Sequence, residues 1–397
     1  MNEPDSVAVV GGGIVGSAAA YRLAREGVET TLFDRRDEGR ATDAGAGIVA
    51  PATSSRTDSE PWFAFAVEAA AHYPDLVASL EADGVTDHGY GSCDLLSVAV
   101  DEDEVEPFET ARRRTERRAE EYGTPAPDSF EEIPIEDARD LFPPLSDAER
   151  AMVYRDQARV DGRTFAAALR EAGETHGLSV EAANVTDVRT DDAPAESDPA
   201  VTGVVADGEF REFDAVIVAG GAWSGAFADA LGLEIPVEPQ RGQIVHLDVD
   251  ARGGHGTAAE VGADTADWPI VSPFRHKYLV PWPDGRVAVG ATREDDTGFA
   301  PRATLAGLHD VYGEALRVAA GLADAEPVET RVGLRPVSRD GLPIIGPVPD
   351  VEGAYLATGH GPTGLTLGPY SGTVVADLAR GVEPGTDPSA FDPARFR

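Results

Sequence analysis

The segment that decides the fold is SVAVVGGGIVGSAAAYRLA, residues 6–24. Its apolar start predicts a buried strand, its alanine-rich end predicts a helix, and a second apolar run at 30–33 predicts another strand. Gly11, Gly13 and Gly16 between strand and helix follow the G-x-G-x-x-G spacing. Such glycines permit a tight turn, close approach of the backbone to a pyrophosphate, and close packing of helix on strand. The segment therefore predicts a Rossmann-type βαβ unit.

An acidic residue stands where this unit would hold a ribose. Asp34 ends the second strand, 18 residues after Gly16, and its carboxylate can accept a hydrogen bond from a ribose hydroxyl. The free N–H groups of the helix N-terminus favour phosphate binding. The glycine spacing alone can be turn chemistry, but this context favours a dinucleotide-binding site.

Three further glycine-rich stretches indicate which dinucleotide binds. They are ATDAGAGIVAP at 41–51, VIVAGGAWS at 216–224 and ATGHGPTGLTLGP at 357–369. Several close backbone approaches suit one long, enclosed cofactor better than a nicotinamide dinucleotide that must enter and leave. We therefore expect FAD.

Length and periodicity predict the architecture. The 397 residues, 42% of them hydrophobic, suffice for two or three lobes. We expect an α/β fold with a discontinuous FAD-binding Rossmann-type domain (1–80, 150–225 and 333–397). A second, α+β substrate domain on a mainly antiparallel sheet would comprise 81–149 and 226–332. The predicted helices are 62–80, 103–121 and 163–176, and the predicted strands include 179–189, 200–213, 214–219, 242–249, 278–281 and 286–290.

Charge and cysteine content narrow the function. With 71 acidic and 33 basic residues the net charge is -38, which disfavours nucleic acid and anionic membranes as partners and suggests adaptation to a salt-loving host. The arginine run at 112–118 is interleaved with glutamates and is interpreted as a paired, solvated helix face. Cys93 is the only cysteine, so no disulfide and no cysteine-based metal site can form within the chain. We expect a cytoplasmic protein without a metal site or an integral membrane span.

Taken together, seven segments resemble the D-amino acid oxidase superfamily of FAD-dependent enzymes, which includes glycine oxidase, sarcosine oxidase and D-amino acid dehydrogenase. These segments span nearly the whole chain; they are GGGIVG, GAGIVAP, VIVAGGAWS, PQRGQIV, KYLVPWPDGRVAVGAT, GLRPVSRDGLPIIG and ATGHGPTGLTLGP. The resemblance implies hydride transfer from a substrate carbon to the flavin. Sarcosine-oxidase-type members carry a flavin-anchoring cysteine near GLRP, where this chain has 332–334 (VGL), so noncovalent FAD is expected.

The resemblance also implies roles for individual residues. Arg335, in GLRP, would bind the substrate carboxylate, although a structural ion pair is the alternative. Tyr278 would reach the same carboxylate or cover the pocket, unless it is a half-buried sheet aromatic. His360 would lie beside the flavin ring, or be an ordinary loop histidine. Arg241 and Arg293 would line the pocket or a hinge, or only pair with carboxylates.

The residues expected to contact FAD come from the glycine-bearing segments and their neighbours. They are Gly11, Gly13, Ile14, Val15, Gly16, Asp34, Arg35, Ala44, Gly45, Ala46, Gly47, Ile48, Val185, Ala219, Gly220, Gly221, Trp223, Gly359, His360, Gly361, Gly364, Leu365 and Thr366.

The expected function is FAD-dependent oxidation of a small amine or amino acid of the glycine, sarcosine or D-amino acid type. The product imine would hydrolyse to an oxo acid and an amine or ammonia, and oxygen, a quinone or another acceptor would reoxidise the flavin. Two alternatives stay open. One is oxidation of a 2-hydroxy acid or glycerol 3-phosphate on the same fold, and the other is a flavin-binding electron-transfer subunit.

Overall fold

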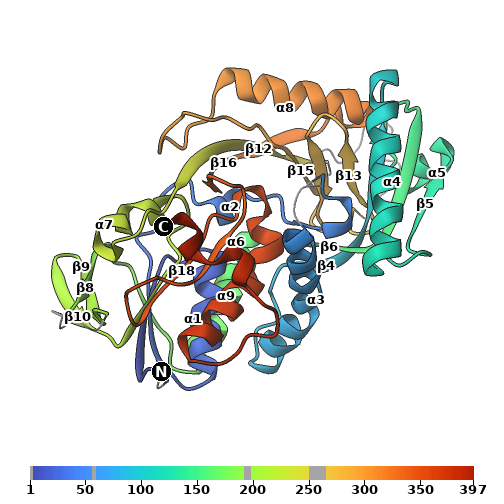
Figure 1. The fold of residues 1–397 in the computed structure, drawn as a ribbon. Coiled ribbons are helices and arrows are strands. Elements are labelled where there is room, and N and C mark those ends of the chain that lie inside the picture. Colours follow the sequence, from blue (N-terminus) through green and yellow to red (C-terminus); the bar gives the residue numbers. More distant parts are fainter. Residues whose placement is uncertain (1–2, 56–59, 192–197, 250–264) are drawn as a thin grey trace.

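The first of two large sheets holds the N-terminal strand at its centre. The computed structural model describes residues 3–55, 60–191, 198–249 and 265–397 (Figure 1). Within this sheet β17 is antiparallel to β18, and the other neighbouring strands are parallel. The strand order is β17 (Ile344–Pro347), β18 (Ala354–Thr358), β11 (Ala215–Val218), β1 (Ser6–Val10), β2 (Glu29–Phe33) and β7 (Ser179–Glu181).

Strand β1 is buried on both faces of this sheet. Val7 and Val9 belong to one hydrophobic cluster, whereas Ala8 and Val10 belong to another. Alternate side chains of a strand point to opposite faces, so a strand covered on both sides needs apolar residues at every position. This burial accounts for the uninterrupted apolar run in the sequence.

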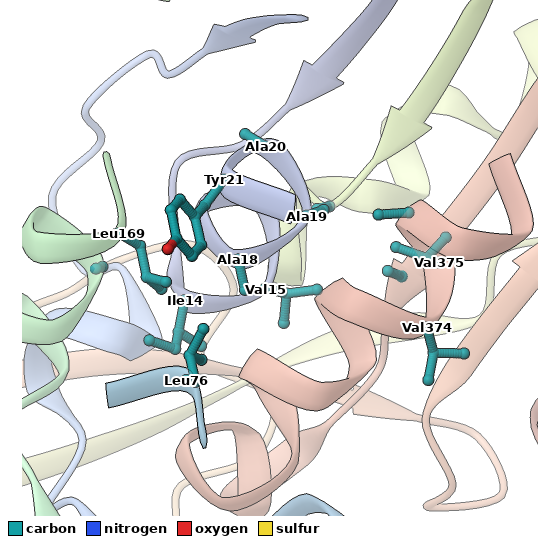
Figure 2. Close-up of a cluster of buried hydrophobic side chains, with 14 of the residues drawn as sticks. Ile14, Val15, Ala18, Ala19, Ala20, Tyr21, Leu76, Leu169, Val374 and Val375 are labelled. Atoms are coloured by element: carbon teal, nitrogen blue, oxygen red, sulfur yellow. The ribbon is translucent and has the colours of Figure 1, made fainter. Parts of the chain in front are cut away.

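Three helices cover one face of the first sheet; they are α1 (Ile14–Arg25), α6 (Gly162–Thr175) and α9 (Gly364–Ala379). Helix α3 (Glu60–Ala82) packs on α9 and α6 and completes this hydrophobic cluster. Figure 2 shows Ile14 and Val15 of α1 between Leu76 of α3 and Val374 of α9. A Cβ on Gly372 would lie 2.5 Å from the Val15 carbonyl oxygen, so glycine permits the close approach of α9 to α1.

A small antiparallel sheet covers the opposite face. It consists of β8 (Val185–Thr190), β9 (Val201–Ala206) and β10 (Glu209–Glu212), and α7 (Ala228–Leu231) lies beside it. Val204 and Val216 are fully buried in the cluster between this sheet and the first one.

The second large sheet is mainly antiparallel. Its strand order is β16 (Glu326–Ser338), β12 (Val237–Asp248), β15 (Arg286–Gly290), β14 (Tyr278–Pro281), β13 (Ile270–Pro273), β4 (Tyr90–Ala99), β6 (Arg150–Val160) and β3 (Ile48–Val49). In this order β13 and β4 are parallel, and the other neighbouring strands are antiparallel. Strand β5 (Phe130–Ile133) pairs with β6 outside the main order.

Alternation along β4 gives this sheet two different faces. Leu96 and Val98 pack with α5 (Ile135–Leu141) and α8 (Leu305–Val318), which Figure 1 shows across the outer face. Leu95 and Ala99 point the other way, into a cluster that includes Phe108 of α4 (Val105–Tyr122). That inner face bounds the cavity described below.

The predicted fold class is confirmed, with some boundaries shifted. Predicted helix 103–121 is a short 3-10 turn (Glu102–Glu104) followed by α4, and predicted strand 200–213 is the β9–β10 hairpin. Predicted strand 179–189 is two strands, β7 and β8, which belong to different sheets. The predicted domain boundaries stay a prediction. Strand β6 falls in segment 150–225 of the predicted FAD-binding domain, but it pairs in the second large sheet. Residues 192–197, between the predicted strands 179–189 and 200–213, lie outside the described residues.

The interpretation of the arginine run was only partly right. Arg112 and Arg113 pair with Glu109, as expected of a solvated helix face. Arg118 and the Nε atom of Arg114 are buried instead. Positions 114 and 118 are one turn apart and therefore share a helix face, and that face turns inward. No described helix is both long and apolar enough to cross a bilayer.

Candidate functional site

A cavity of about 1220 Å³ lies against the inner face of the second sheet. Its wall also includes the β1–α1 turn, the loop that contains Gly45 and Gly47, the turn after β11, and the turn that leads into α9. This volume exceeds the ordinary range of ~300–1,000 Å³ for drug-sized ligands. It has room for a large cofactor together with a small substrate.

The β1–α1 turn forms one end of the cavity. Gly11 has a φ of +108°, and a Cβ there would lie 2.5 Å from the carbonyl oxygen of Ala219. Gly16 does not line the cavity, because it packs so closely that a Cβ on it would collide with the Gly11 carbonyl. Ile14 N donates to Thr42 Oγ1 at 3.0 Å. These contacts account for glycine at two of the three motif positions and place a helix N-terminus at the cavity wall.

Asp34 lies at this same end but already has partners. Its Oδ2 accepts a hydrogen bond from Arg40 Nη1 at 2.6 Å, and its Oδ1 accepts one from Arg36 N at 2.9 Å. Arg40 also pairs with Asp43. A Cβ on Gly12 would lie 2.6 Å from Asp34 Oδ2, so the carboxylate lies directly over the glycine turn. Each oxygen keeps a lone pair that could accept a ribose hydroxyl.

The remaining glycine stretches converge on the cavity. Gly47 has a φ of +82°, and a Cβ on it would collide with the Val160 carbonyl. Thr366 Oγ1 donates to the Ile48 carbonyl at 3.0 Å and so ties the turn into α9 to that loop. Ala219 N donates to Val10 O at 2.8 Å, which brings the glycine-rich stretch 216–224 against β1.

Nearly all residues expected at FAD line this cavity. Gly16 and Gly359 do not, since both serve packing in the turns. Several polar or aromatic lining residues lie outside every motif that the sequence offered; they are Arg40, Trp62, Ser97, Arg114, Tyr154 and Ser272. A helical or sheet position next to a cavity has no local signature, so these could be found only from the fold.

Arg335, on β16, stands in the wall at the second sheet. Its Nη1 donates to the Thr292 carbonyl at 3.0 Å and lies 3.5 Å from Gln240 Oε1. A Cβ on Gly242 would lie 2.5–2.6 Å from the guanidinium, so the absence of a side chain there makes room for it. Within the described chain Arg335 has no carboxylate partner, which disfavours the alternative of a structural ion pair. Arg293 lines the cavity too, whereas Arg241 is paired with Glu294 and does not.

Tyr278 of β14 lies within hydrogen-bonding reach of Arg335. Burial raises the pKa of the Tyr278 phenol, and the nearby Arg335 charge partly opposes that change. Burial likewise lowers the pKa of the Arg335 guanidinium, while Tyr278 opposes the change. The phenol is thus protonated at neutral pH, and the pair presents a cation and a hydroxyl to the same part of the cavity.

His360 is 2% exposed and lines the cavity in the turn before α9. Its Nε2 lies 2.9 Å from Ser371 Oγ, and Ser371 donates its hydroxyl proton to the Leu367 carbonyl. Nε2 must therefore carry the proton of the neutral ring. Burial lowers the pKa of His360 to about 4, so the ring is uncharged at neutral pH.

These features fit FAD. Glycine main chain from four separate parts of the sequence encloses a cavity that begins at a helix N-terminus and ends at a polar sheet face. A phosphate-bearing cofactor fits the first end, and a small anionic substrate fits the second. In the described ranges no group of histidine, cysteine or carboxylate side chains could hold a metal ion.

Comparisons with known proteins agree with this geometry. Residues 6–378 match the family "FAD dependent oxidoreductase" (DAO). The chain is 37% identical over 390 residues to the uncharacterized oxidoreductase YurR of Bacillus subtilis, with 98% of each chain covered. It is 33% identical to glycine oxidase of Pseudomonas aeruginosa, covering 98% of this chain and 99% of that one. Among solved structures, iminodiacetate oxidase from Chelativorans sp. BNC1 superposes with a TM-score of 0.87 at 35% identity, with 98% of each chain covered.

Proposed function

Because this chain belongs to the FAD-dependent oxidoreductase family, we propose that it oxidises a small amine or amino acid of the glycine, sarcosine or D-amino acid type. The observation that carries the proposal is Arg335, a cation without a carboxylate partner in the described chain, in the wall of the cavity that fits FAD. Two similar proteins, a glycine oxidase and an iminodiacetate oxidase, are named for amines that carry a carboxylate.

In this proposal Arg335 binds the substrate carboxylate. A guanidinium can give a carboxylate two parallel, charge-assisted hydrogen bonds, which fix orientation as well as position. The bond from Nη1 to Thr292 O holds one side of the fork, and the other N–H groups are left for the substrate. Tyr278 adds a hydroxyl donor at the same place. The carboxylate would then determine which carbon faces the flavin.

FAD, held by the glycine turns around the cavity, would supply a two-electron acceptor for the hydride of the carbon that bears the nitrogen. The chain contributes binding, orientation and exclusion of bulk water. His360 acts there as a neutral wall residue, because its Nε2 proton is already donated to Ser371. The substrate loses two electrons and two protons to give an imine, which water hydrolyses to an oxo acid and an amine or ammonia.

The test is anaerobic reduction of the purified holoprotein in high salt, followed by the loss of flavin absorbance. We expect bleaching by one or more of glycine, sarcosine, proline and D-amino acids. Bleaching by 2-hydroxyglutarate or glycerol 3-phosphate alone would replace amine oxidation with hydroxyl oxidation. Bleaching by none of them, with activity only in the presence of a partner protein, would favour an electron-transfer subunit.

Arg335→Ala tests the residue assignment. Loss of a charged contact in a desolvated site costs about 2–5 kcal/mol, or about 30-fold to several thousand-fold in kcat/KM, mainly through KM for carboxylate substrates. Arg302→Ala is the matched control, since Arg302 is exposed and does not line the cavity. Equal kinetics of both variants would remove Arg335 from the substrate site.

A further inference from the structure

The cavity continues past Arg335 and Tyr278 to helix α4. Glu106, Thr110 and Arg114 of α4 line it, at spacings that place them on one helix face. The Arg114 Nε atom is buried and has no hydrogen-bond partner. No ion pair of Arg114 exists among residues 3–55, 60–191, 198–249 and 265–397. The Arg114 side chain therefore lies in the cavity wall without an ion-pair partner in the part of the chain that the structure describes.

Arg114 differs in this respect from Arg112 and Arg113 on the same helix, which form ion pairs with Glu109. Acidic residues outnumber basic ones by 71 to 33 in this chain, so carboxylate partners are plentiful. Burial lowers the pKa of the Arg114 guanidinium, Tyr154 opposes that change, and Arg117 adds to it. Arg114 is half-buried, so part of the desolvation cost of its charge is not offset by a partner among the described residues. An anion in the cavity would offset it.

Strand register relates Arg114 to the Arg335 end. Val271 pairs with Leu279, which puts Ser272 opposite Tyr278, and Ser272 pairs with Ser97 on β4. Tyr278, Ser272 and Ser97 all line the cavity, so they form a row across its floor. At about 4.8 Å per strand, β14 and β4 are roughly 10 Å apart.

The row leads on to α4. Tyr154 of β6 lies on the far side of β4 from β13, and its hydroxyl lies 3.0 Å from Thr115 Oγ1 of α4. Arg114 is the residue next to Thr115, and its charge acts on Tyr154. The cavity floor thus has the Arg335 and Tyr278 pair at one end and Arg114 at the other.

We infer that Arg114 binds a second acidic group of the substrate, so that the enzyme acts on amines that carry two carboxylates. The inference rests on the proposed function, because Arg335 would hold the carboxylate next to the oxidised carbon while Arg114 holds the remote one. Glycine and sarcosine, which have one carboxylate, would leave Arg114 without a partner. Exposed Glu106 lies two turns away on α4 and would repel a second carboxylate placed nearer the helix start.

Matched substrates test the inference through a ratio. Iminodiacetate is compared with N-ethylglycine, N-(2-carboxyethyl)glycine with N-propylglycine, and D-glutamate with D-norvaline; each second compound has a methyl group in place of the remote carboxylate. The ratio for each pair is kcat/KM of the dicarboxylic compound divided by kcat/KM of its methyl analogue. For the pair with the largest ratio in the parent enzyme, we expect Arg114→Gln to lower that ratio by about 30-fold or more. Arg114→Lys should retain part of it, and Arg117→Gln, on an exposed residue outside the cavity, should leave it unchanged.

A binding measurement removes the dependence on turnover. Adipate should raise the Tm of the holoprotein more than butyrate does at equal concentration and ionic strength, since a ligand that binds the folded state stabilises it more the lower its Kd is relative to its concentration. That difference should vanish in Arg114→Gln and persist in Arg117→Gln. An unchanged difference in Arg114→Gln would overturn the inference. Loss of the Tm difference in Arg293→Gln, with the difference kept in Arg114→Gln, would also overturn the inference, because Arg293 lines the same cavity and would then be the residue that binds the second carboxylate.

The two proposals fail in distinguishable ways. Parent enzyme that is reduced by glycine or sarcosine as readily as by every dicarboxylic amine would overturn the role of Arg114 and leave amine oxidation standing. Parent enzyme that no amine reduces, but whose Tm responds to adipate through Arg114, would overturn the proposed function and leave the anion site standing.

Discussion

Gly242 tests the position of Arg335 without touching Arg335 itself. In Gly242→Ala the new Cβ would lie 2.5–2.6 Å from the guanidinium atoms, closer than any non-bonded contact allows. The backbone of Gly242 is not in the left-handed region, so alanine can adopt it. The flexible arginine side chain must therefore move away from Thr292 O.

The expected size of the effect follows from the bond that would be lost. A hydrogen bond from a charged group contributes about 1.5–3 kcal/mol, which corresponds to a decrease of about 10- to 150-fold in kcat/KM for carboxylate substrates. Global stability should change by less than about 1 kcal/mol, because alanine also restricts the unfolded chain. Steady-state kinetics and urea unfolding of the holoprotein measure the two quantities.

Two comparisons make the outcome decisive. Gly313→Ala, in α8 with nothing within 4 Å of the added Cβ, should keep full kcat/KM. In an Arg335→Met background, Gly242→Ala should cause no further loss, because both changes act on one interaction. Full activity of Gly242→Ala, or an equally large additional loss in the Arg335→Met background, would refute the placement of Arg335 over Gly242.

Three other outcomes are expected. Asp34→Asn keeps an oxygen that can accept from Arg40 or Arg36 N, and should weaken FAD retention during dialysis less than Asp34→Ala does; an Asp34→Ala variant that keeps stoichiometric flavin would contradict the ribose assignment. Burial beside Arg331 and Arg286 lowers the pKa of His246 to about 4. Between pH 6.5 and 4 the unfolded state therefore binds a proton that the folded state does not, and the free energy of unfolding decreases as the pH is lowered through this range. His246→Gln should reduce the decrease between pH 7.5 and pH 4.5 by about 2–3 kcal/mol. The net charge of -38 should make Tm rise with NaCl concentration, whereas a maximal Tm in dilute buffer would argue against self-repulsion as the dominant surface effect.

The parts of the fold that sequence predicted well are those fixed by local sterics. Gly16 is required by its contact with the Gly11 carbonyl in the same turn, and Gly11 by its positive φ, so their spacing leaves a visible pattern in the sequence. The apolar run of β1 reflects burial on both faces, which also leaves a direct pattern. The placement of β7 and β8 in two sheets depends on distant partners, so the single predicted strand at 179–189 was wrong.

The site divides in the same way. The turns that carry Gly47 and Gly361 were found because glycine marks them, and Arg335 because it stands in a motif with a family resemblance. Arg114 was misread, since a helix with charges at nearly every position has no periodicity that reveals its buried face. Only the position of α4 against β4 and Tyr154 shows where that side chain points.

The central claim is that one cavity, enclosed by glycine main chain from separate stretches, holds FAD. The most direct measurement is a crystal structure of the protein purified with flavin at high salt. We expect one FAD per chain in the 1220 Å³ cavity, in contact with the Gly11 turn, the Gly47 loop and the turn that leads into α9. A protein that contains no flavin and takes up none, or flavin bound outside this cavity, would contradict the claim.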